Sequence, residues 1–374
     1  MEAVPKSMTN SRAIGTPAPM EGCGGYNRSS CVQATGSSSV VPLFEGAANQ
    51  AQLTSAANPV VIADYGSSEG RNSLEPLTAA IGVLRRRIGP ERAIWVVHTD
   101  LPSNDFTALF RMLASDPSSY LRRDPAVFVP AIGRSFYDQI LPSSSVTLGW
   151  SSWAVQWLSR VPTLIPDQVQ VAYSRDAGAR AAFAQQAAED WRCFLTHRAA
   201  ELRPGGRLVV LSMAVDEHGD FGYRPAVAAI YEGIMDLVKE GFVKEEEARR
   251  MVIPTVGRSR QEFMAPFALN GSFSNLALEE IEVFFGEDHI WAEFQNNGDP
   301  LAFGARWAAF SRASVGPTLA TSLDPGEGRA AEFMRRLEAR MAARLSSAPQ
   351  STLIPLVKMV LVKESSGRPL DSGL

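Results

Sequence analysis

Two acidic residues in the first third of the chain each follow a short apolar segment that is typical of a buried strand. The first segment is 60–64, which ends at Asp64, and the turn after it contains Gly66 and Gly70. Glycines let a backbone approach a ligand closely and adopt φ values that other residues resist. The dinucleotide fingerprint has the spacing G-x-G-x-x-G, whereas this turn has G-x-x-x-G. The missing glycine argues against a nicotinamide oxidoreductase.

The second acid, Asp100, stands at the tip of the next predicted strand, 93–97. A carboxylate at this place can accept hydrogen bonds from both hydroxyls of a ribose. In doubly wound sheets, ligands bind outside the carboxyl ends of the strands, where both acids lie. Because Asp64 would crowd a pyrophosphate, the pair favours a ligand with a cationic end and no diphosphate, such as S-adenosylmethionine. The alternative is that Asp100 caps a helix start, since Pro102 and Asn104 follow it.

Strands and helices must alternate to place these two tips side by side. After the glycine turn, apolar residues recur at helical spacing from Leu74 to Leu84 and stop before a basic run at 85–87. Similar patterns predict further strands and helices along the chain. They are strands at 145–149, 207–213, 281–285 and 353–362, and helices at 181–202, 301–314 and 328–345. This alternation predicts an open α/β sheet.

The pattern of apolar and polar residues also divides the chain into a tail, a core and a cap. Residues 1–19 have no periodicity and are expected to form a flexible N-terminal tail. Residues 215–272 are expected to be mainly helical, with loops at 216–220 and 254–258, and to cover one end of the sheet. The core is then built from 20–214 and 273–374.

Composition excludes several classes of protein. The chain has 36 Lys and Arg against 40 Asp and Glu, a net charge of −4, so a nucleic-acid partner is not expected. No apolar run reaches the roughly 20 residues of a membrane span, and no secretory signal is visible. Cys23, Cys31 and Cys193 show no metal-site spacing and cannot form a closed set of disulfides. A reduced, cytoplasmic enzyme without a metal is the expected class.

Five separated stretches together resemble the SABATH family, the salicylate/benzoate-type carboxyl methyltransferases that depend on S-adenosylmethionine. The stretch SSWAVQWLSRVP at 151–162 is the most specific, because paired serines followed by W-L-S-x-V-P are improbable by chance. The other four are YNRSSCVQ at 26–33, IADYGSSEGRN at 62–72, HTDLPSNDF at 98–106 and GRSFYDQILP at 133–142. The resemblance implies a class I methyltransferase-type open sheet, mostly parallel with an antiparallel last strand, carrying an inserted helical cap.

Carried over position by position, the resemblance implies a site for S-adenosylmethionine, whose product is S-adenosylhomocysteine. The residues that would bind this cofactor are Tyr26, Ser30, Gln33, Asp64, Gly66, Ser67, Asn72, Asp100, Leu101, Ser135, Phe136 and Ser151. Ser135 and Phe136 would contact the adenine. Gln33 and Trp157 would hold the substrate carboxylate as the catalytic pair, with Trp153 and Gln156 lining the substrate pocket.

The chain also departs from the family at several positions. The family opens with Met-Lys-Gly or Met-Asn-Gly, whereas this chain has Met20-Glu21-Gly22, so that an acid replaces a lysine. In the glycine turn, Glu69 and Arg71 replace a small residue and a proline. These changes leave the implied cofactor site more complete than the implied substrate site.

The expected reaction needs little from the protein. A carboxylic acid with a pKa of about 4–5 is ionised at neutral pH, so its oxygen can attack a sulfonium methyl group directly, without a general base. The protein must align the reactants and exclude water, and alignment is worth about 7–11 kcal/mol. Gln33 and Trp157 offer neutral donors, which orient an oxygen without burying it in an ion pair.

Alternative interpretations remain at this point. Trp153 and Trp157 are four residues apart, which on a helix is the spacing of a core stripe, and Gln33 could be an ordinary polar cap residue. His98 and Asp100 make a weak metal pair, and a structural role for His98 is favoured. The rival functions are methylation of an oxygen or nitrogen on a molecule that is not an acid, and a non-catalytic S-adenosylmethionine-binding protein.

The substrate is expected to be a small-molecule carboxylic acid, either a fatty acid or a small aromatic acid. Aromatic residues of the expected cap, Tyr223, Tyr231, Phe263 and Phe267, suggest that it carries an apolar tail. By analogy with the family, a homodimer is a further possibility.

Overall fold

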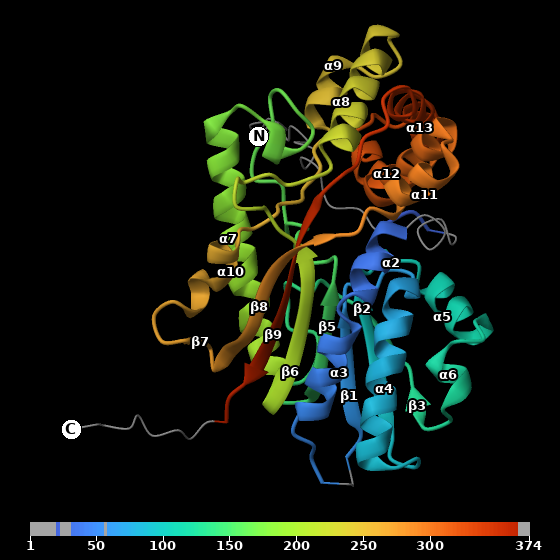
Figure 1. Ribbon diagram of the computed structural model, residues 1–374. Helices are drawn as coiled ribbons and strands as arrows, with labels where there is room; N and C mark the ends of the chain where they lie inside the picture. The colour runs from blue at the N-terminus through green and yellow to red at the C-terminus, as the bar shows by residue number, and fades with distance from the viewer. Residues whose placement is uncertain (1–19, 23–30, 56–57, 366–374) are drawn as a thin grey trace, which may run out of the picture.

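A sheet of nine strands lies at the centre of the computed structural model, which describes residues 20–22, 31–55 and 58–365 (Figure 1). The order is β3-β2-β1-β5-β6-β9-β8-β7, and β4 pairs with β2 beside β3. The strands are β1 (Val60–Tyr65), β2 (Ile94–Asp100), β3 (Val127–Phe128), β4 (Ala131–Gly133), β5 (Val146–Ser152), β6 (Leu202–Met213), β7 (Ser272–Phe273), β8 (Leu276–Gly286) and β9 (Ile354–Lys363).

Strand directions match the predicted architecture. β1 pairs in parallel with β2 and β5, and β5 pairs in parallel with β6. β9 runs antiparallel between β6 and β8, so the last strand of the chain is inserted in reverse. The prediction of a mostly parallel open sheet with an antiparallel last strand is confirmed.

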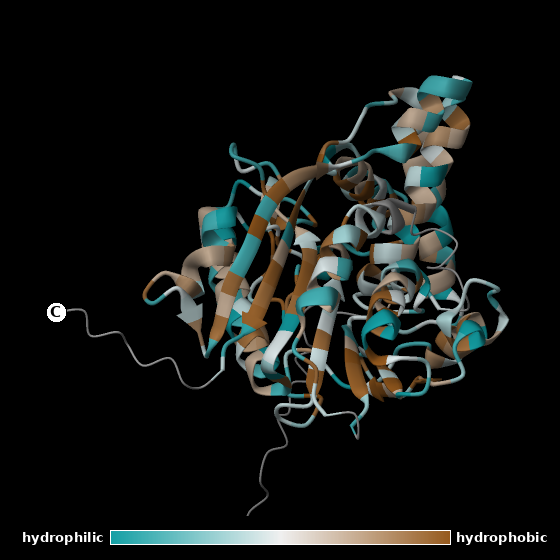
Figure 2. Ribbon diagram, turned by 60° about the horizontal axis from the view of Figure 1, so that its bottom comes forward, coloured by the Kyte–Doolittle hydropathy of each residue, from teal (hydrophilic) through white to brown (hydrophobic). Residues whose placement is uncertain are grey.

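Helices cover both faces of this sheet. α3 (Val41–Gln50) and α4 (Leu74–Ile88) cover one face, and α7 (Ala177–Glu201) and α10 (Arg260–Met264) lie on the other (Figure 1). Neighbouring strand residues point to opposite faces, so Ile62 packs in the core with α3 and α4 while Ala63 packs in the core under α7. Burial on both faces explains why the central strands β1, β5 and β6 are mostly apolar (Figure 2).

A group of helices lies over the carboxyl ends of the parallel strands. α8 (Arg224–Lys239) packs against α13 (Arg329–Ser347), and α13 packs along α12 (Pro300–Ala320) (Figure 1). α9 (Glu245–Arg250) follows α8, and α11 (His289–Asn297) precedes α12. The layer over the sheet therefore combines helices from 215–272 with helices from the later part of the chain. The division into a core of 20–214 and 273–374 and a cap of 215–272 stays a prediction.

Several short elements had no sequence signal. They include α3 and the two- and three-residue strands β3, β4 and β7, together with α2 (Cys31–Ser38), α5 (Phe106–Ser115) and α6 (Tyr120–Arg123). A strand of two or three residues is too short to show alternation. Among the helices in the described ranges, none is both long and apolar enough to cross a membrane.

Candidate active site

The glycine turn after β1 brings two distant segments into contact. Gly66 has a φ of +86°, and a Cβ at this position would lie 2.5 Å from the Cβ of Ala154, which follows β5. Gly70 has a φ of +84°, and its Cβ would lie 2.2 Å from Leu109 of α5. Both positions therefore require glycine, because the backbone conformation is left-handed and protein atoms fill the space of a side chain.

Asp100 lies beside this turn, at the end of β2. The backbone N–H groups of Ser68 and Leu101 each donate a hydrogen bond of 2.7 Å to its carboxylate. Burial raises the pKa of Asp100 to about 6, although these two N–H groups act in the opposite direction. The side-chain oxygens of Ser67 and Ser68 are buried next to it without a hydrogen-bond partner among the described residues. Unpaired buried hydroxyls beside a carboxylate are suited to a polar ligand.

Asp64 is tied to its neighbours in the sheet. Its carboxylate lies 2.8 Å from Nδ1 of His98, and Nε2 of that imidazole lies 2.6 Å from the hydroxyl of Tyr120. Asp64 and His98 are buried partners in the β1–β2 register. His98 therefore holds a carboxylate and a phenol in place, in agreement with the structural role favoured for it. No group of three or more His, Cys, Asp or Glu in the part of the chain that is described could hold a metal ion.

The segment with Ser135 and Phe136 follows β4 and is held by α7. Arg198 donates to the carbonyl oxygen of Phe136 over 2.8 Å and forms a buried ion pair of 2.8 Å with Glu201. Glu201 also accepts hydrogen bonds from the backbone N–H of Leu141 and from the hydroxyl of Tyr65. This network connects the segment to the tip of β1.

The remaining predicted cofactor residues occupy the same end of the sheet. Ser135 accepts a hydrogen bond from the backbone N–H of Tyr137, and Ser151 donates to the carbonyl oxygen of Tyr65. Asn72 lies in the single-turn helix Arg71–Ser73 that precedes α4. The predictions for Tyr26 and Ser30 lie outside the described residues.

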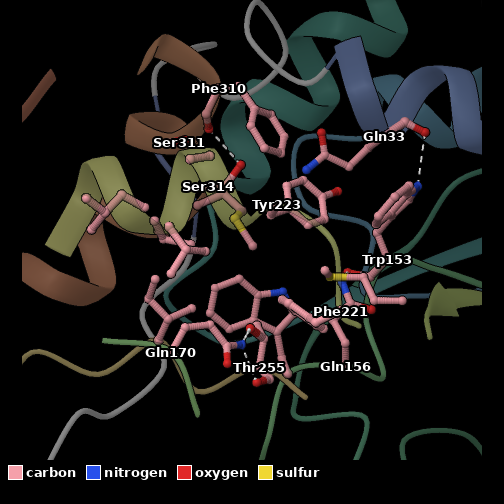
Figure 3. Close-up of a pocket in the computed structure, with 18 residues that line it drawn as sticks. Gln33, Trp153, Gln156, Gln170, Phe221, Tyr223, Thr255, Phe310, Ser311 and Ser314 are labelled. Carbon is pink, nitrogen blue, oxygen red and sulfur yellow. Dashed lines mark hydrogen bonds between the residues drawn. The ribbon is translucent and has the colours of Figure 1, made fainter. Parts of the chain in front are cut away.

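The segment after β5 is a turn and not a helix. Trp153 has a φ of +56°, and the backbone of Trp157 forms a bridge with Thr255 from the segment after α9. The two tryptophans therefore do not form a helical stripe, although Trp153 does pack in the core. The turn places Trp153 and Trp157, together with Gln33 and Gln156, around one pocket (Figure 3).

Hydrogen bonds divide these four residues into two pairs. The indole N–H of Trp153 donates to the carbonyl oxygen of Gln33 over 3.0 Å. The side-chain amide of Gln156 donates to the carbonyl oxygen of Trp153 and accepts from Ser212. Trp153 and Gln156 thus stabilise the turn, and a Cβ on Gly36 would lie 2.7 Å from the Trp153 ring.

The other pair is less constrained. Oε1 of Gln33 is buried without a hydrogen-bond partner, and the indole N–H of Trp157 has no acceptor within the described segments. The donors that these two pocket-lining side chains offer are the amide nitrogen of Gln33 and the indole N–H of Trp157, neither of which donates to another described residue.

No charged side chain is among the 18 described residues that line this pocket. Its unfilled space is about 640 Å³, part of which is open to solvent. The wall is mostly apolar and comes from the turn after β5, from β6 and from helices α8 and α12. Sequence analysis did not find Met20, Gln170, Met213, Phe221, Thr255, Phe310, Ser311 or Ser314, which also line it. Only the packing of α8 and α12 over the sheet brings these residues together.

Of the four aromatic residues expected to receive an apolar tail, Tyr231 of α8 does not line the pocket and packs, partly buried, against the core. Tyr223 lines the pocket, where its ring stacks on Phe310 with centroids 6.1 Å apart. Phe263 and Phe267 instead pack in the core under α7, where the ring centroids of Phe263 and Trp191 are 5.4 Å apart. Phe263 and Phe267 therefore do not line the substrate pocket, contrary to the expectation from the sequence.

Comparison with known proteins decides the family. The profile described as "SAM dependent carboxyl methyltransferase" matches residues 19–364. The chain belongs to this family. It is similar to gibberellic acid methyltransferase 2 of Arabidopsis thaliana, with 26% identity over 80% of this chain and 82% of that protein. Indole-3-acetate O-methyltransferase 1 of Arabidopsis thaliana is 26% identical over 88% of this chain and 89% of that protein.

A solved structure shows the same fold. A loganic acid methyltransferase with SAH superimposes with a TM-score of 0.73 at 20% identity, over 93% of this chain and 99% of that chain. The protein is therefore an S-adenosylmethionine-dependent carboxyl O-methyltransferase with the class I fold, as the resemblance implied.

Glu21 shows how this methyltransferase uses a residue that departs from the family opening. Its carboxylate forms an ion pair with Arg312 of α12 at 2.8 Å. The acid at this position thus joins the segment 20–22 to the helical layer. Its neighbour Met20 lines the pocket.

Proposed function

We propose that this methyltransferase converts an apolar carboxylic acid to its methyl ester, with Gln33 and Trp157 orienting the carboxylate. One observation carries the proposal: the pocket beside the carboxyl ends of the strands is lined by apolar side chains and neutral donors, with no charged group among its described residues. A cationic wall would hold the substrate carboxylate as a ground-state ion pair, which would raise the barrier to its attack.

The residues present fit the cofactor that the family requires. Asp100 would accept hydrogen bonds from the ribose hydroxyls, and the buried hydroxyls of Ser67 and Ser68 have no other partner in the described ranges. Gly66 lies beside Phe136, since a Cβ at Gly66 would be 3.7 Å from that ring, and so it joins the glycine turn to the segment proposed to contact the adenine. When bound, S-adenosylmethionine supplies an electrophilic methyl group on a sulfonium. Asp64, Asn72, Leu101, Ser135, Phe136 and Ser151 complete the proposed binding set.

The chain supplies no general base in this mechanism. The substrate acid is ionised at neutral pH, and its oxygen takes the methyl group by direct displacement. The indole N–H of Trp157 and the amide of Gln33 donate to the carboxylate and fix its direction. Neutral donors of this kind favour the transition state, in which the negative charge of the carboxylate is being neutralised.

The helical layer excludes water from this reaction. Phe221, Ile230 and Phe310 come from the segment after β6, from α8 and from α12, and they form an apolar wall over the turn after β5. We propose that residues 215–272 act as the cap, together with α12. A dry pocket strengthens the two hydrogen bonds to the carboxylate, because the local dielectric constant is low.

The direct test uses the purified full chain with isotopically labelled S-adenosylmethionine. A panel of saturated fatty acids and small aromatic acids is offered, with alcohols, phenols and amines of matched size as controls. We expect labelled methyl esters from acids and no product from the controls, detected by mass spectrometry. Methylation of a control compound but of no acid would replace the proposal with methylation of a neutral group. Binding of the cofactor without any product would favour a non-catalytic protein.

A further inference from the structure

The turn after β5 is held through three consecutive backbone carbonyl groups. The carbonyl oxygens of Val155 and Gln156 accept hydrogen bonds of 2.7 and 2.9 Å from residues 256–258, in the segment after α9. The carbonyl oxygen of Trp157 accepts a hydrogen bond of 2.5 Å from the hydroxyl of Tyr137. Of these three bonds, only the third comes from the segment that follows β4, and it reaches the residue that carries the catalytic indole.

Tyr137 is tightly connected to the two residues proposed to contact the adenine, Ser135 and Phe136. Its backbone N–H donates to the hydroxyl oxygen of Ser135 over 3.2 Å, and its ring centroid lies 4.7 Å from that of Phe136. Its carbonyl oxygen accepts a bond of 3.1 Å from Sγ of Cys193 on α7. Because a hydrogen bond, a ring contact and the chain itself join Tyr137 to Ser135 and Phe136, any restriction of their motion also restricts its phenol.

The phenol of Tyr137 acts on Trp157 from outside the substrate pocket. Tyr137 is not among the described residues that line this pocket. Burial of the phenol raises the pKa of Tyr137 above its ordinary value, although the nearby guanidinium of Arg258 acts in the opposite direction. The hydroxyl therefore stays protonated at neutral pH and remains a donor to the carbonyl oxygen of Trp157.

We propose that Tyr137 is a positioning residue, which couples occupancy of the cofactor site to the position of Trp157, the donor to the substrate carboxylate. A cofactor whose adenine contacts Ser135 and Phe136 restricts their segment, and the phenol then restricts the backbone that carries the indole. This inference rests on the proposed function, because that function gives Trp157 its role. The loaded enzyme should bind an acid more tightly than the empty enzyme, and by linkage the acid should strengthen cofactor binding by the same factor.

Hydrogen exchange of the full chain, with and without S-adenosylhomocysteine, measures this coupling in the absence of any acid. The backbone N–H groups of Trp157 and Leu158 report on the turn, since they donate to backbone carbonyl oxygens over 3.0 and 2.8 Å. Such amides exchange through local opening, so a more restricted turn exchanges more slowly. We expect S-adenosylhomocysteine to slow exchange in 134–138, and to slow it in 154–160 by about two- to tenfold, the factor that one neutral hydrogen bond supplies.

Two phenylalanine variants show whether the phenol carries this effect. Tyr137→Phe removes one hydroxyl and keeps the ring, so S-adenosylhomocysteine should still slow exchange in 134–138 but should no longer slow it in 154–160. Tyr173→Phe is the matched control, because its hydroxyl also donates to a backbone carbonyl, that of Gly222, which lies outside the turn. This control should keep the slower exchange in both segments, and urea unfolding checks that both variants fold.

Steady-state kinetics, with the acid that the wild type methylates best, provide a second measurement. Tyr137→Phe should lower kcat/KM for this acid by about two- to tenfold and change the Kd for S-adenosylhomocysteine by less than about twofold. A merely structural role of Tyr137 would weaken both steps, because a loosened fold would affect the cofactor site and the turn alike.

The exchange measurement contains no acid, so its outcome is separate from that of the proposed function. Slower exchange in 154–160 that depends on Tyr137, without methylation of any acid, would leave the coupling in place and refute the function. Slower exchange that is equal in the wild type and in Tyr137→Phe would overturn the coupling alone. A wild type in which S-adenosylhomocysteine leaves exchange in either 134–138 or 154–160 unchanged would overturn it as well.

Discussion

The backbone N–H of Glu21 donates a hydrogen bond of 3.0 Å to the carbonyl oxygen of Ala313 in the middle of α12. This carbonyl lacks its usual helical donor, because the residue four positions later is Pro317, which has no N–H. The proline therefore creates an acceptor on the helix surface, and the segment 20–22 uses it. Met20 is thereby held against the substrate pocket.

Replacement of Pro317 by alanine should separate stability from activity. The restored N–H would compete with Glu21 for the carbonyl of Ala313, and removal of proline from the helix should raise the free energy of unfolding by roughly 1–3 kcal/mol. We expect KM for the acid to rise severalfold at the same time. Urea unfolding and steady-state kinetics measure the two effects, and an unchanged KM would show that the hydrogen bond does not matter for the site.

Trp157→Phe tests the donor role of the indole. Loss of a hydrogen bond to a charged group should weaken binding of the transition state by about 1.5–3 kcal/mol, and kcat/KM for the preferred acid should fall accordingly. Trp95→Phe is the control, since Trp95 is 45% exposed on β2 and lies outside the described pocket lining. If both variants keep wild-type kcat/KM, Trp157 serves only for packing.

Cofactor affinity should depend on pH through Asp100. The pKa of this carboxyl is raised to about 6, and only its ionised form can accept hydrogen bonds from both ribose hydroxyls. Affinity should therefore be constant above about pH 7 and fall up to tenfold per unit as the pH decreases below 6. Calorimetric titration with S-adenosylhomocysteine measures it. Asp100→Asn should bind more weakly and lose this pH dependence, whereas a wild-type affinity that is flat down to about pH 5 would remove Asp100 from the site.

Glu201→Gln should disrupt the connection between α7 and the segment at 135–141. The carboxylate pairs with Arg198 and accepts from the N–H of Leu141, and a neutral amide would leave the arginine buried without a counter-charge. We expect a loss of about 3–5 kcal/mol in the free energy of unfolding, together with weaker cofactor binding. Glu189→Gln on the same helix affects only exposed contacts, an ion pair with Arg160 and a hydrogen bond from Gln185, and should change stability by less than about 0.5 kcal/mol. Equal effects in both variants would contradict this role.

Gly66→Ala should weaken cofactor binding, both because of its backbone conformation and because of contact with Ala154. Gly89→Ala is the control that tests the backbone cause alone. At Gly66 the left-handed backbone and the 2.5 Å approach to Ala154 both oppose a Cβ, whereas Gly89 has a φ of +77° with open space around it. Because Gly89 has a ψ of 177°, a conformation that side chains rarely adopt, Gly89→Ala should cost about 1–3 kcal/mol of stability from the backbone alone and leave cofactor affinity unchanged. Gly66→Ala should cost more and raise the Kd for S-adenosylhomocysteine. Equal unfolding free energies and unchanged Kd in the two variants would refute the steric argument.

Local patterns predicted much of the fold and several site positions. The apolar run that ends at Asp64 and the helical spacing after Gly70 correspond to β1 and α4, because burial on two faces or on one stripe leaves a periodic trace in the sequence. Trp153, Gln156 and Trp157 were implied by the resemblance of the stretch at 151–162 to the family and not by periodicity, and all three line the pocket. The spacing of the two tryptophans suggested a helix there, which was wrong because turn geometry at Trp153 has no periodic signal.

The chain's amino-acid order alone thus determined the family, the alternation of strands and helices, and which acids and glycines stand at strand ends. Only the tertiary structure decided that α8 and α12 meet over the turn after β5, that the side-chain donors of Gln33 and Trp157 bond to no other described residue, and that Pro317 presents a carbonyl to Glu21. The physical reason is the difference in sequence separation over which these effects act. Propensity and periodicity act over a few neighbouring residues, whereas a pocket wall arises from contacts between residues hundreds of positions apart, which no local pattern encodes.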